Sequence, residues 1–248
     1  MGIFFKTGKK GRSFSYADQR SHRHRIRWVV LGVFVFFLIY SSLTSFVFSI
    51  RVLENETMAP NLLPGERFIF SSYNIYSLIP GLDMEKGLLP FHRGSIVLVD
   101  TYKGEEPGLV LRFLDGAVRF LTVQRLSLVD QKEYLFVKRV IGLPGDEITM
   151  ANFAIRVKAK GSSYSLTEFE VTDQDYTPEI PQIPALWDSS LPFSGNMDKI
   201  VLGENECFVL SDDRSNTNDS RTWGPVPVKN IAGKALFRFW PFTRLGRP

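Results

Sequence analysis

The amino-acid sequence predicts a mostly β protein that follows an N-terminal transmembrane helix. Two features indicate this fold class: one long uncharged apolar stretch near the start of the chain, and a series of short apolar runs after it. The chain has 248 residues, of which 44% are hydrophobic and 23% are charged. That length is sufficient to bury a sizeable core, and the composition is typical of a folded protein.

The apolar stretch covers residues 28–50, which are 23 residues without a charge before Arg51. A helix rises about 1.5 Å per residue, so a helix of this length crosses a hydrocarbon core of roughly 30 Å with some tilt. The alternatives are a buried core helix and a cleaved secretion signal. A secretion signal has a shorter apolar region, of about 7–15 residues, and a small-x-small cleavage site that this segment lacks. We therefore expect an uncleaved transmembrane helix over 28–50.

Positive charge is concentrated in front of this stretch. Residues 1–27 contain eight Lys or Arg and one acidic residue, a net charge of +7, whereas the rest of the chain has 22 basic and 25 acidic residues. Basic flanks stay on the cytoplasmic side, so we expect a single-pass membrane protein with its N-terminus inside. Residues 1–27 would form a cytoplasmic tail and residues 51–248 an extracytoplasmic domain. The acidic balance of the body argues against a nucleic-acid partner.

Short apolar runs separated by Gly, Pro, Asp or Asn recur after the apolar stretch, and they predict strands. No segment there has sustained helical periodicity. The segment 161–196 is rich in Pro, Ser and acidic residues, and we expect an irregular excursion or a small subdomain there. The predicted strands include Arg67–Phe70, Ser95–Val99, Tyr134–Val137, Cys207–Leu210 and Ala235–Trp240.

The residue inventory limits the chemistry. The chain has one cysteine and three histidines, which excludes an internal disulfide and leaves no ligand set for a His/Cys zinc site. Cys207 lies in an apolar run, and we expect it to be a buried thiol. Catalysis would therefore rest on hydroxyls, carboxylates and lysines, and no metal or cofactor is expected.

Three polar blocks then stand out, and in this order behind an N-terminal apolar segment they resemble the sequence boxes of bacterial type I signal peptidases. Residues 93–97 and 233–246 are similar to two further strand boxes of that family. The resemblance covers the chain from the apolar stretch to the C-terminal end, except about 101–132 and 149–200. We expect these two ranges to be variable insertions in the peptidase domain. The three blocks are NETMAPNLLPGE (55–66), VKRVIGLPGD (137–146) and SDDRSNTNDSRTWGPV (211–226).

The resemblance implies two antiparallel β-sheet domains and a protease that cleaves signal peptides from exported preproteins. It implies that the hydroxyl of Thr57 attacks the scissile carbonyl and that Lys138 is the base. A lysine can accept a proton only when it is neutral, and burial favours the neutral form. Lys138 follows the apolar run 134–137, and Val140 and Ile141 come soon after it, so we expect a desolvated amine. Without the surrounding blocks, a surface Lys-Arg pair on a strand would be the simpler interpretation.

The chain departs from the family at five positions in these blocks, one of which is Thr217, where the family carries a serine. Thr57 replaces the nucleophilic serine, and Asn55 replaces a serine that helps to bind the oxyanion; an Asn amide can also donate to an oxyanion. Glu56 and Ser211 each stand where the family carries glycine. Further implied roles are lysine orientation by Thr217, structural support near the site by Asp219 and Arg221, and a substrate pocket shaped by Met58 and Pro60.

Signal peptides and membrane lipid are the implied partners, with the secretion machinery as a further candidate. One alternative is a signal-peptidase-like protein that binds signal peptides without cleaving them, because of Thr57, Asn55 and Glu56. Another is a membrane-tethered β domain with a structural role. A further enzyme alternative is a self-cleaving repressor that uses a lysine dyad. Such a repressor would need a DNA-binding helix-turn-helix, and this chain has the apolar stretch at that place.

Overall fold

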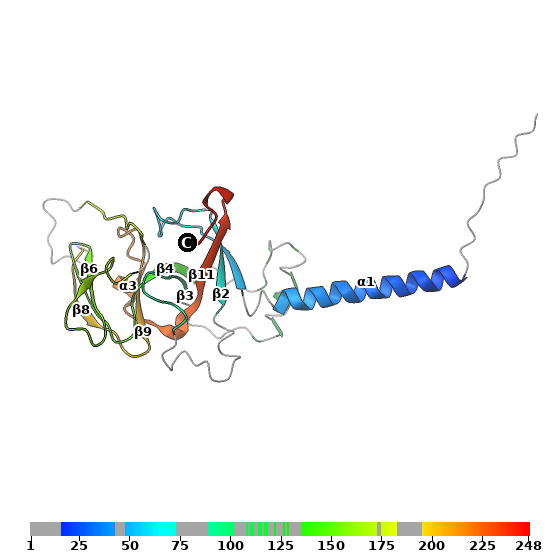
Figure 1. Ribbon diagram of the computed structural model, residues 1–248, viewed down its shortest axis with the longest axis horizontal. Helices are drawn as coiled ribbons and strands as arrows, with labels where there is room; N and C mark the ends of the chain where they lie inside the picture. Colours follow the sequence, from blue (N-terminus) through cyan, green and yellow to red (C-terminus); the bar gives the residue numbers. More distant parts are fainter. Residues whose placement is uncertain are drawn as a thin grey trace, which may run out of the picture.

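The computed structural model describes residues 16–42, 48–72, 89–101, 135–172, 175–182 and 195–248, together with isolated positions between 108 and 128. One long helix precedes a body built from two antiparallel β-sheets (Figure 1). The prediction of a mostly β protein with two antiparallel sheets is confirmed.

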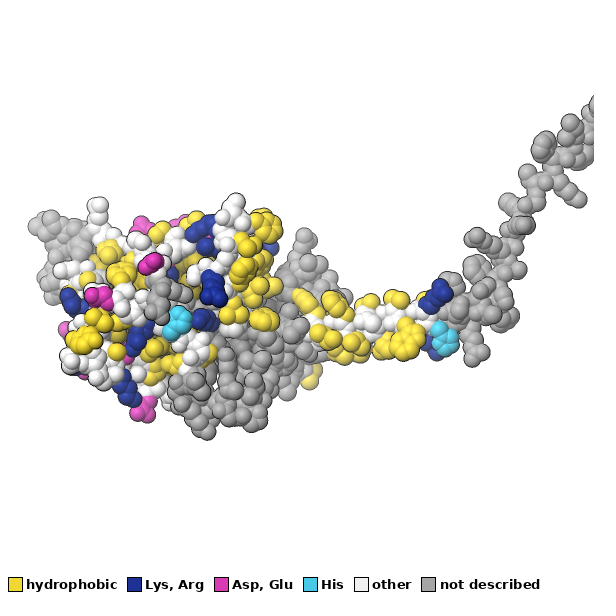
Figure 2. Space-filling view, viewed as in Figure 1, with side chains coloured by type: hydrophobic (Ala, Val, Ile, Leu, Met, Phe, Trp, Pro, Cys, Tyr) yellow, Lys and Arg dark blue, Asp and Glu magenta, His cyan; other side chains and the backbone are white. Residues whose placement is uncertain are grey.

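Helix α1 (Tyr16–Ser42) begins inside the basic tail and ends before the predicted span does. The predicted helix over 28–50 is wrong at its C-terminal end, because residues 48–50 belong to strand β1 (Phe48–Val52). Apolar and polar residues alternate there, as Phe-Ser-Ile-Arg-Val, and this period of two matches a strand. Among the described residues, no helix is both long enough and apolar enough to cross a membrane. Large apolar side chains are nonetheless exposed along α1 from Ile26 to Ile39 (Figure 2).

The larger sheet has seven strands in the order β1-β2-β11-β3-β4-β9-β10. All five predicted strands lie in it, and strands β1 and β10 at its two edges complete it. Its remaining strands are β2 (Arg67–Ser72), β3 (Ile96–Asp100), β4 (Leu135–Gly142), β9 (Glu206–Leu210), β10 (Val226–Pro227) and β11 (Ile231–Trp240).

The smaller sheet has four strands in the order β7-β6-β5-β8. Most of it lies in the expected insertion 149–200, so that region adds a sheet to the fold. Within 161–196, a segment expected to be irregular, Tyr176 is buried in the core between the two sheets. The strands are β5 (Glu147–Ala151), β6 (Ala154–Lys158), β7 (Leu166–Thr167) and β8 (Met197–Val201).

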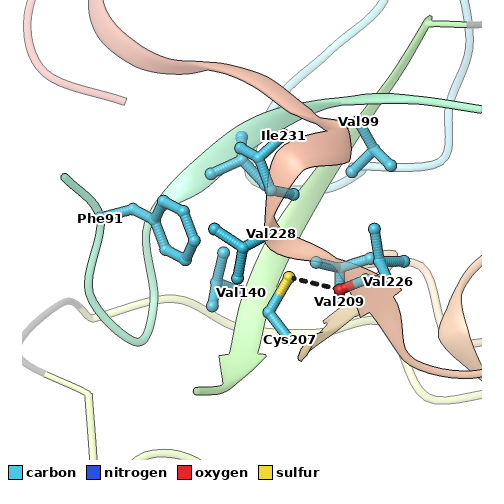
Figure 3. Packing of buried hydrophobic residues seen from close by; sticks show 9 residues of the cluster. Phe91, Val99, Val140, Cys207, Val209, Val226, Val228 and Ile231 are labelled. Carbon is cyan, nitrogen blue, oxygen red and sulfur yellow. Dashed lines mark hydrogen bonds between the residues drawn. The ribbon is translucent and has the colours of Figure 1, made fainter. Parts of the chain in front are cut away.

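The larger sheet is covered on both faces. Strand β3 sends Val97 and Val99 into one apolar cluster and Ile96 and Leu98 into another. Figure 3 shows the first cluster, in which the thiol of Cys207 donates a hydrogen bond to the carbonyl oxygen of Val226 at 3.3 Å. Burial raises the pKa of this thiol to about 12, so the prediction of a buried, unreactive cysteine is confirmed.

The turn between β4 and β5 joins the two sheets. Asp146 is 1% exposed, and its carboxylate accepts hydrogen bonds from the backbone N–H groups of Leu143 and Lys160. Arg93 donates to both oxygens of the same carboxylate, at 2.8 to 3.0 Å. Since a buried carboxylate must be paired, this ion pair fixes the turn at the end of β4.

The C-terminal part of the chain also contains three short helical turns: α3 (Ser220–Trp223), η5 (Val228–Asn230) and η6 (Phe242–Arg244). Asp219 is the N-cap of α3 and accepts the backbone N–H of Arg221. This turn therefore follows directly from the Asp-Ser-Arg sequence of the third polar block.

Gly233 of β11 gives a test of this packing. A Cβ at this position would lie 1.9 Å from the carbonyl oxygen of Ser71, which is backbone and cannot move aside as a side chain can. We expect Gly233→Ala to destabilise the body by about 2 kcal/mol or more and to lower the Tm by roughly 4–8 °C. Thermal unfolding followed by circular dichroism measures the change.

Gly108→Ala is the matched control, because an added Cβ there meets no atom within 4 Å. This variant should unfold within about 2 °C of the wild type. A Gly233→Ala protein as stable as the control would contradict the close approach of β11 to β2.

Candidate active site

Lys138 lies in the interior of the larger sheet. It is on β4, pairs with Val97 of β3, and has no exposed surface. Burial lowers the pKa of its amine from 10.5 to about 8, against the opposing effect of the Asp219 carboxylate. The prediction of a desolvated lysine is confirmed. A lysine with this pKa is substantially neutral in mildly alkaline solution.

The amine of Lys138 has one hydrogen-bond partner among the described residues. Nζ donates to Oγ of Ser211 at 2.8 Å, and both residues are fully buried. The ring of Trp223 lies beside it, with its centroid 5.8 Å from Nζ. Trp223 is itself held by the Phe136 ring, 5.4 Å away between centroids, and by a hydrogen bond from Nε1 to Asn218.

Asp219 lies behind Ser211. Its buried carboxylate accepts the backbone N–H of Ser211 at 3.0 Å and forms an ion pair of 2.7 Å with Arg221. Arg221 also donates to the carbonyl oxygen of Arg214 at 2.8 Å. These contacts connect the turn that carries Asp219 and Arg221 to Lys138 through Ser211.

Thr57 lies in the loop between β1 and β2 and is 7% exposed. Its Oγ1 donates to Oδ1 of Asn55 at 2.9 Å, and its carbonyl oxygen accepts the N–H of Asp213 at 3.1 Å. Asp213 is two residues beyond Ser211, so the third block contacts both the loop of Thr57 and the amine of Lys138. Between the described atoms of Thr57 and Lys138 there is no hydrogen bond; catalytic contacts often form only when substrate is bound.

The loop that carries Thr57 is anchored at its far end. Glu66 is 3% exposed and forms ion pairs with Arg238, at 3.2 Å, and with Arg244, at 2.5 Å. Its backbone carbonyl accepts the N–H of Leu53 at 2.9 Å. The C-terminal strand and turn therefore hold the loop in place.

The other predicted site residues lie as follows. Met58 is fully buried in the cluster beneath β2 and β3, whereas Pro60 and Glu56 are exposed. Thr217 is half-buried; its carbonyl oxygen accepts the hydroxyl of Thr222 at 2.5 Å. In the part of the chain that the structure describes, its own hydroxyl makes no hydrogen bond to Lys138, and Ser211 occupies that place.

Sequence reasoning missed a second buried network on the opposite face of β4. Arg139 donates to both carboxylate oxygens of Asp212, at 2.6 and 2.7 Å, and Asn61 donates to the same carboxylate at 2.9 Å. The guanidinium also lies 4.0 Å from the ring centroid of Tyr176. Strand alternation was the available signal, because Arg139 must point away from Lys138 and needs its own partner.

The network continues into the segment that follows β7. Glu168 accepts the hydroxyl of Tyr176 at 2.8 Å and forms an ion pair of 2.6 Å with Arg214. Groups of three or more His, Cys, Asp or Glu with a geometry suited to a metal ion do not occur in the described ranges. The charged residues around the site therefore pair with one another and hold the third block against β4.

Comparison with known proteins relates the sequence of this chain to one protein family. The family model described as signal peptidase, peptidase S26, matches residues 25–240. The "Probable signal peptidase I-1" of Synechocystis sp. is 27% identical over 202 residues, which cover 82% of this chain and 76% of that protein. The "Signal peptidase I" of Leptolyngbya laminosa is 27% identical over 205 residues, which cover 82% and 73% of the two chains.

The "Signal peptidase IB" of Staphylococcus aureus is 26% identical over 220 residues, which cover 88% of this chain and 91% of that protein. The matched range includes all three polar blocks and both sheets. This chain therefore belongs to the signal peptidase family, peptidase S26, a family of serine-type proteases that process signal peptides.

Proposed function

We propose that this protein is a membrane-bound endopeptidase that removes signal peptides from exported preproteins, with Thr57 as nucleophile and Lys138 as base. The observation that carries the proposal is the buried amine of Lys138, whose pKa is lowered to about 8 in a chain of the signal peptidase family. A perturbed lysine next to hydroxyl groups is the arrangement that an activated nucleophile requires.

The reaction would proceed in two stages. The Oγ1 of Thr57 attacks the carbonyl carbon of the scissile peptide bond while neutral Lys138 accepts the hydroxyl proton. The amine leaving group takes that proton, and the signal peptide remains attached to Thr57 as an ester. Lys138, neutral again, then accepts a proton from the water that attacks the ester. The Oγ1 of Thr57 leaves and takes this proton from Lys138, so the signal peptide is released as an acid and both residues are restored.

The oxyanion formed in both stages needs hydrogen-bond donors. Asn55 lies beside the nucleophile, with its Oδ1 2.9 Å from Oγ1 of Thr57, so its amide nitrogen is a candidate donor. One such donor is worth about 10²–10³ in kcat in a serine protease. Met58 and Pro60 follow the nucleophile in the sequence, and we assign them to the substrate pocket as the family resemblance implies.

A position in the bacterial cytoplasmic membrane follows from the N-terminal region. Large apolar side chains are exposed along α1, and membrane lipid would cover them (Figure 2). Basic residues precede them, which favours a cytoplasmic N-terminus. The extracytoplasmic body would then meet the signal peptide at the membrane surface, where membrane lipid and the secretion machinery are its neighbours.

The second candidate is a protein that binds signal peptides without cleaving them. The observation that favours it is the direction of the Thr57 hydroxyl, which donates to Asn55 and not to Lys138. The β-methyl of threonine also restricts χ1 beside the attacking oxygen. The substitutions at position 57 described below separate the two candidates.

The pH dependence tests the base. Lys138 must be neutral, so cleavage of a preprotein by the detergent-solubilised protein should be slow below pH 8, rise through an apparent pKa of about 8, and then level off. Lys138→Arg should be inactive at every pH, because guanidinium keeps its proton. Lys199→Arg is the matched control on an exposed lysine and should keep the wild-type rate. Cleavage by the Lys138→Arg variant would remove lysine from the mechanism.

The nucleophile is tested by four variants. Thr57→Ala and Thr57→Val both lack the hydroxyl and should lose cleavage, although valine keeps the shape of the side chain. Thr57→Ser should keep or raise the rate, because it retains the oxygen and loses the crowding methyl. Thr149→Val, at a half-buried position on β5, is the matched control and should cleave normally.

Two results of this series decide between the candidates. A silent wild type, together with binding of a signal peptide, would favour the second candidate, and revival by Thr57→Ser would then locate the defect at the methyl group. Cleavage by Thr57→Val at the wild-type rate would show that another group attacks.

Topology is tested by proteolysis of intact spheroplasts. Protease added outside should digest residues 51–248 and leave residues 1–27 protected, because the +7 tail precedes the uncharged stretch. Antibodies against an N-terminal and a C-terminal tag follow the two parts, and lysed spheroplasts serve as the control. Loss of the N-terminal tag with an intact body would reverse the proposed orientation.

A further inference from the structure

Lys138 has to be held in one rotamer to act as a base. In the structure, an unexpected residue forms the hydrogen bond that holds its amine. The resemblance implies that a hydroxyl at position 217 orients the lysine. In the structure the partner is Ser211, whose Oγ accepts a hydrogen bond from Nζ at 2.8 Å. The resemblance implies glycine at the position of Ser211, so it does not predict this contact.

Ser211 is fixed in its own position by two contacts with the turn that carries Asp219. Its backbone N–H donates to the buried Asp219 carboxylate at 3.0 Å. Two residues earlier, the N–H of Val209 donates to Oγ of Ser220 at 3.0 Å. These two bonds join the end of β9 to the start of α3, so the hydroxyl of Ser211 approaches Lys138 from a rigid support.

Among the residues that the structure describes, the hydrogen bonds of Thr217 involve its backbone and not its side chain. Its carbonyl oxygen accepts the hydroxyl of Thr222 at 2.5 Å and the N–H of Asp219 at 2.8 Å. Within the described ranges, no hydrogen bond of the Thr217 hydroxyl occurs. Of the hydroxyls at positions 211 and 217, only that of Ser211 forms a hydrogen bond with the amine in the described part of the chain.

We propose that Ser211 is the positioning residue of Lys138 in this chain, in place of Thr217; this rests on the proposed function. By accepting one N–H of the amine, Ser211 restricts the rotation about the Cε–Nζ bond, so that the single lone pair of neutral Lys138 can be directed toward the nucleophile. Ser211 does not touch the reacting atoms. Its effect on the reaction passes entirely through the lysine.

The experiment compares Ser211→Ala and Ser211→Gly with Thr217→Val. Both changes at 211 remove the same oxygen, and glycine is the residue of the family, so a folding defect of one variant does not hide the result. We expect kcat to fall about ten- to a hundredfold in both, with KM within about twofold, because the base is misplaced. The apparent pKa of cleavage should also fall, since the ammonium loses a hydrogen-bond acceptor.

The loss of kcat in Thr217→Val should be at least tenfold smaller than the loss in either variant at position 211. The pH profile of Thr217→Val should match that of the wild type. Ser215→Ala removes an exposed hydroxyl of the same block and is the matched control, with wild-type kcat expected. An equal or larger loss in Thr217→Val, or an unchanged pH profile in both variants at 211, would overturn the proposal.

A failure of the proposed function remains distinguishable from a failure of this inference. In protein labelled with [¹³C]lysine, the pH titration of Lys138 Cε can be followed by NMR without any turnover, with Lys138→Arg used for assignment. If the wild type does not cleave, the proposed function fails, but a lower pKa of Lys138 in Ser211→Ala still supports the contact. An identical titration in the two proteins would overturn it.

Discussion

Burial of one amine in the middle of a seven-stranded sheet imposes most of the other features of the site. Keeping Lys138 charged there costs free energy, and the lowering of its pKa from 10.5 to about 8 corresponds to roughly 3 kcal/mol. Since the unfolded chain binds more protons between those two pH values, the stability of the fold rises with pH across that window. The Ser211 hydroxyl, the Asp219 carboxylate and the Trp223 ring limit the cost without returning the amine to water.

The same constraint explains why one polar block serves both faces of β4. Lys138 and Arg139 are adjacent on the strand, so their side chains leave it on opposite sides. Ser211 receives the first and Asp212, the next residue in the chain, receives the second. Neither charge can be buried unless this segment is in place. The segment in turn is held by the Asp219–Arg221 ion pair, because the Asp219 carboxylate also accepts the backbone N–H of Ser211.

Much of this arrangement could be predicted from the sequence. The five apolar runs became strands, and the apolar neighbours of Lys138 correctly predicted its burial. Strand β1 was missed because its alternation directly follows a longer apolar stretch. The second sheet was expected from the resemblance, but its individual strands were not located, because they are short and only partly buried. Ser211 could not be found this way. A serine in a polar turn has several possible partners, and only the fold selects the lysine.

The burial of the single cysteine also has a practical consequence. Cys207 has no exposed surface, and a thiol with a pKa of about 12 is almost entirely protonated near neutral pH. Thiol-directed reagents should therefore leave the native protein unlabelled. A second cysteine introduced at an exposed position would be the only site to react, so a spin label or fluorophore could be attached to the folded protein without first removing Cys207.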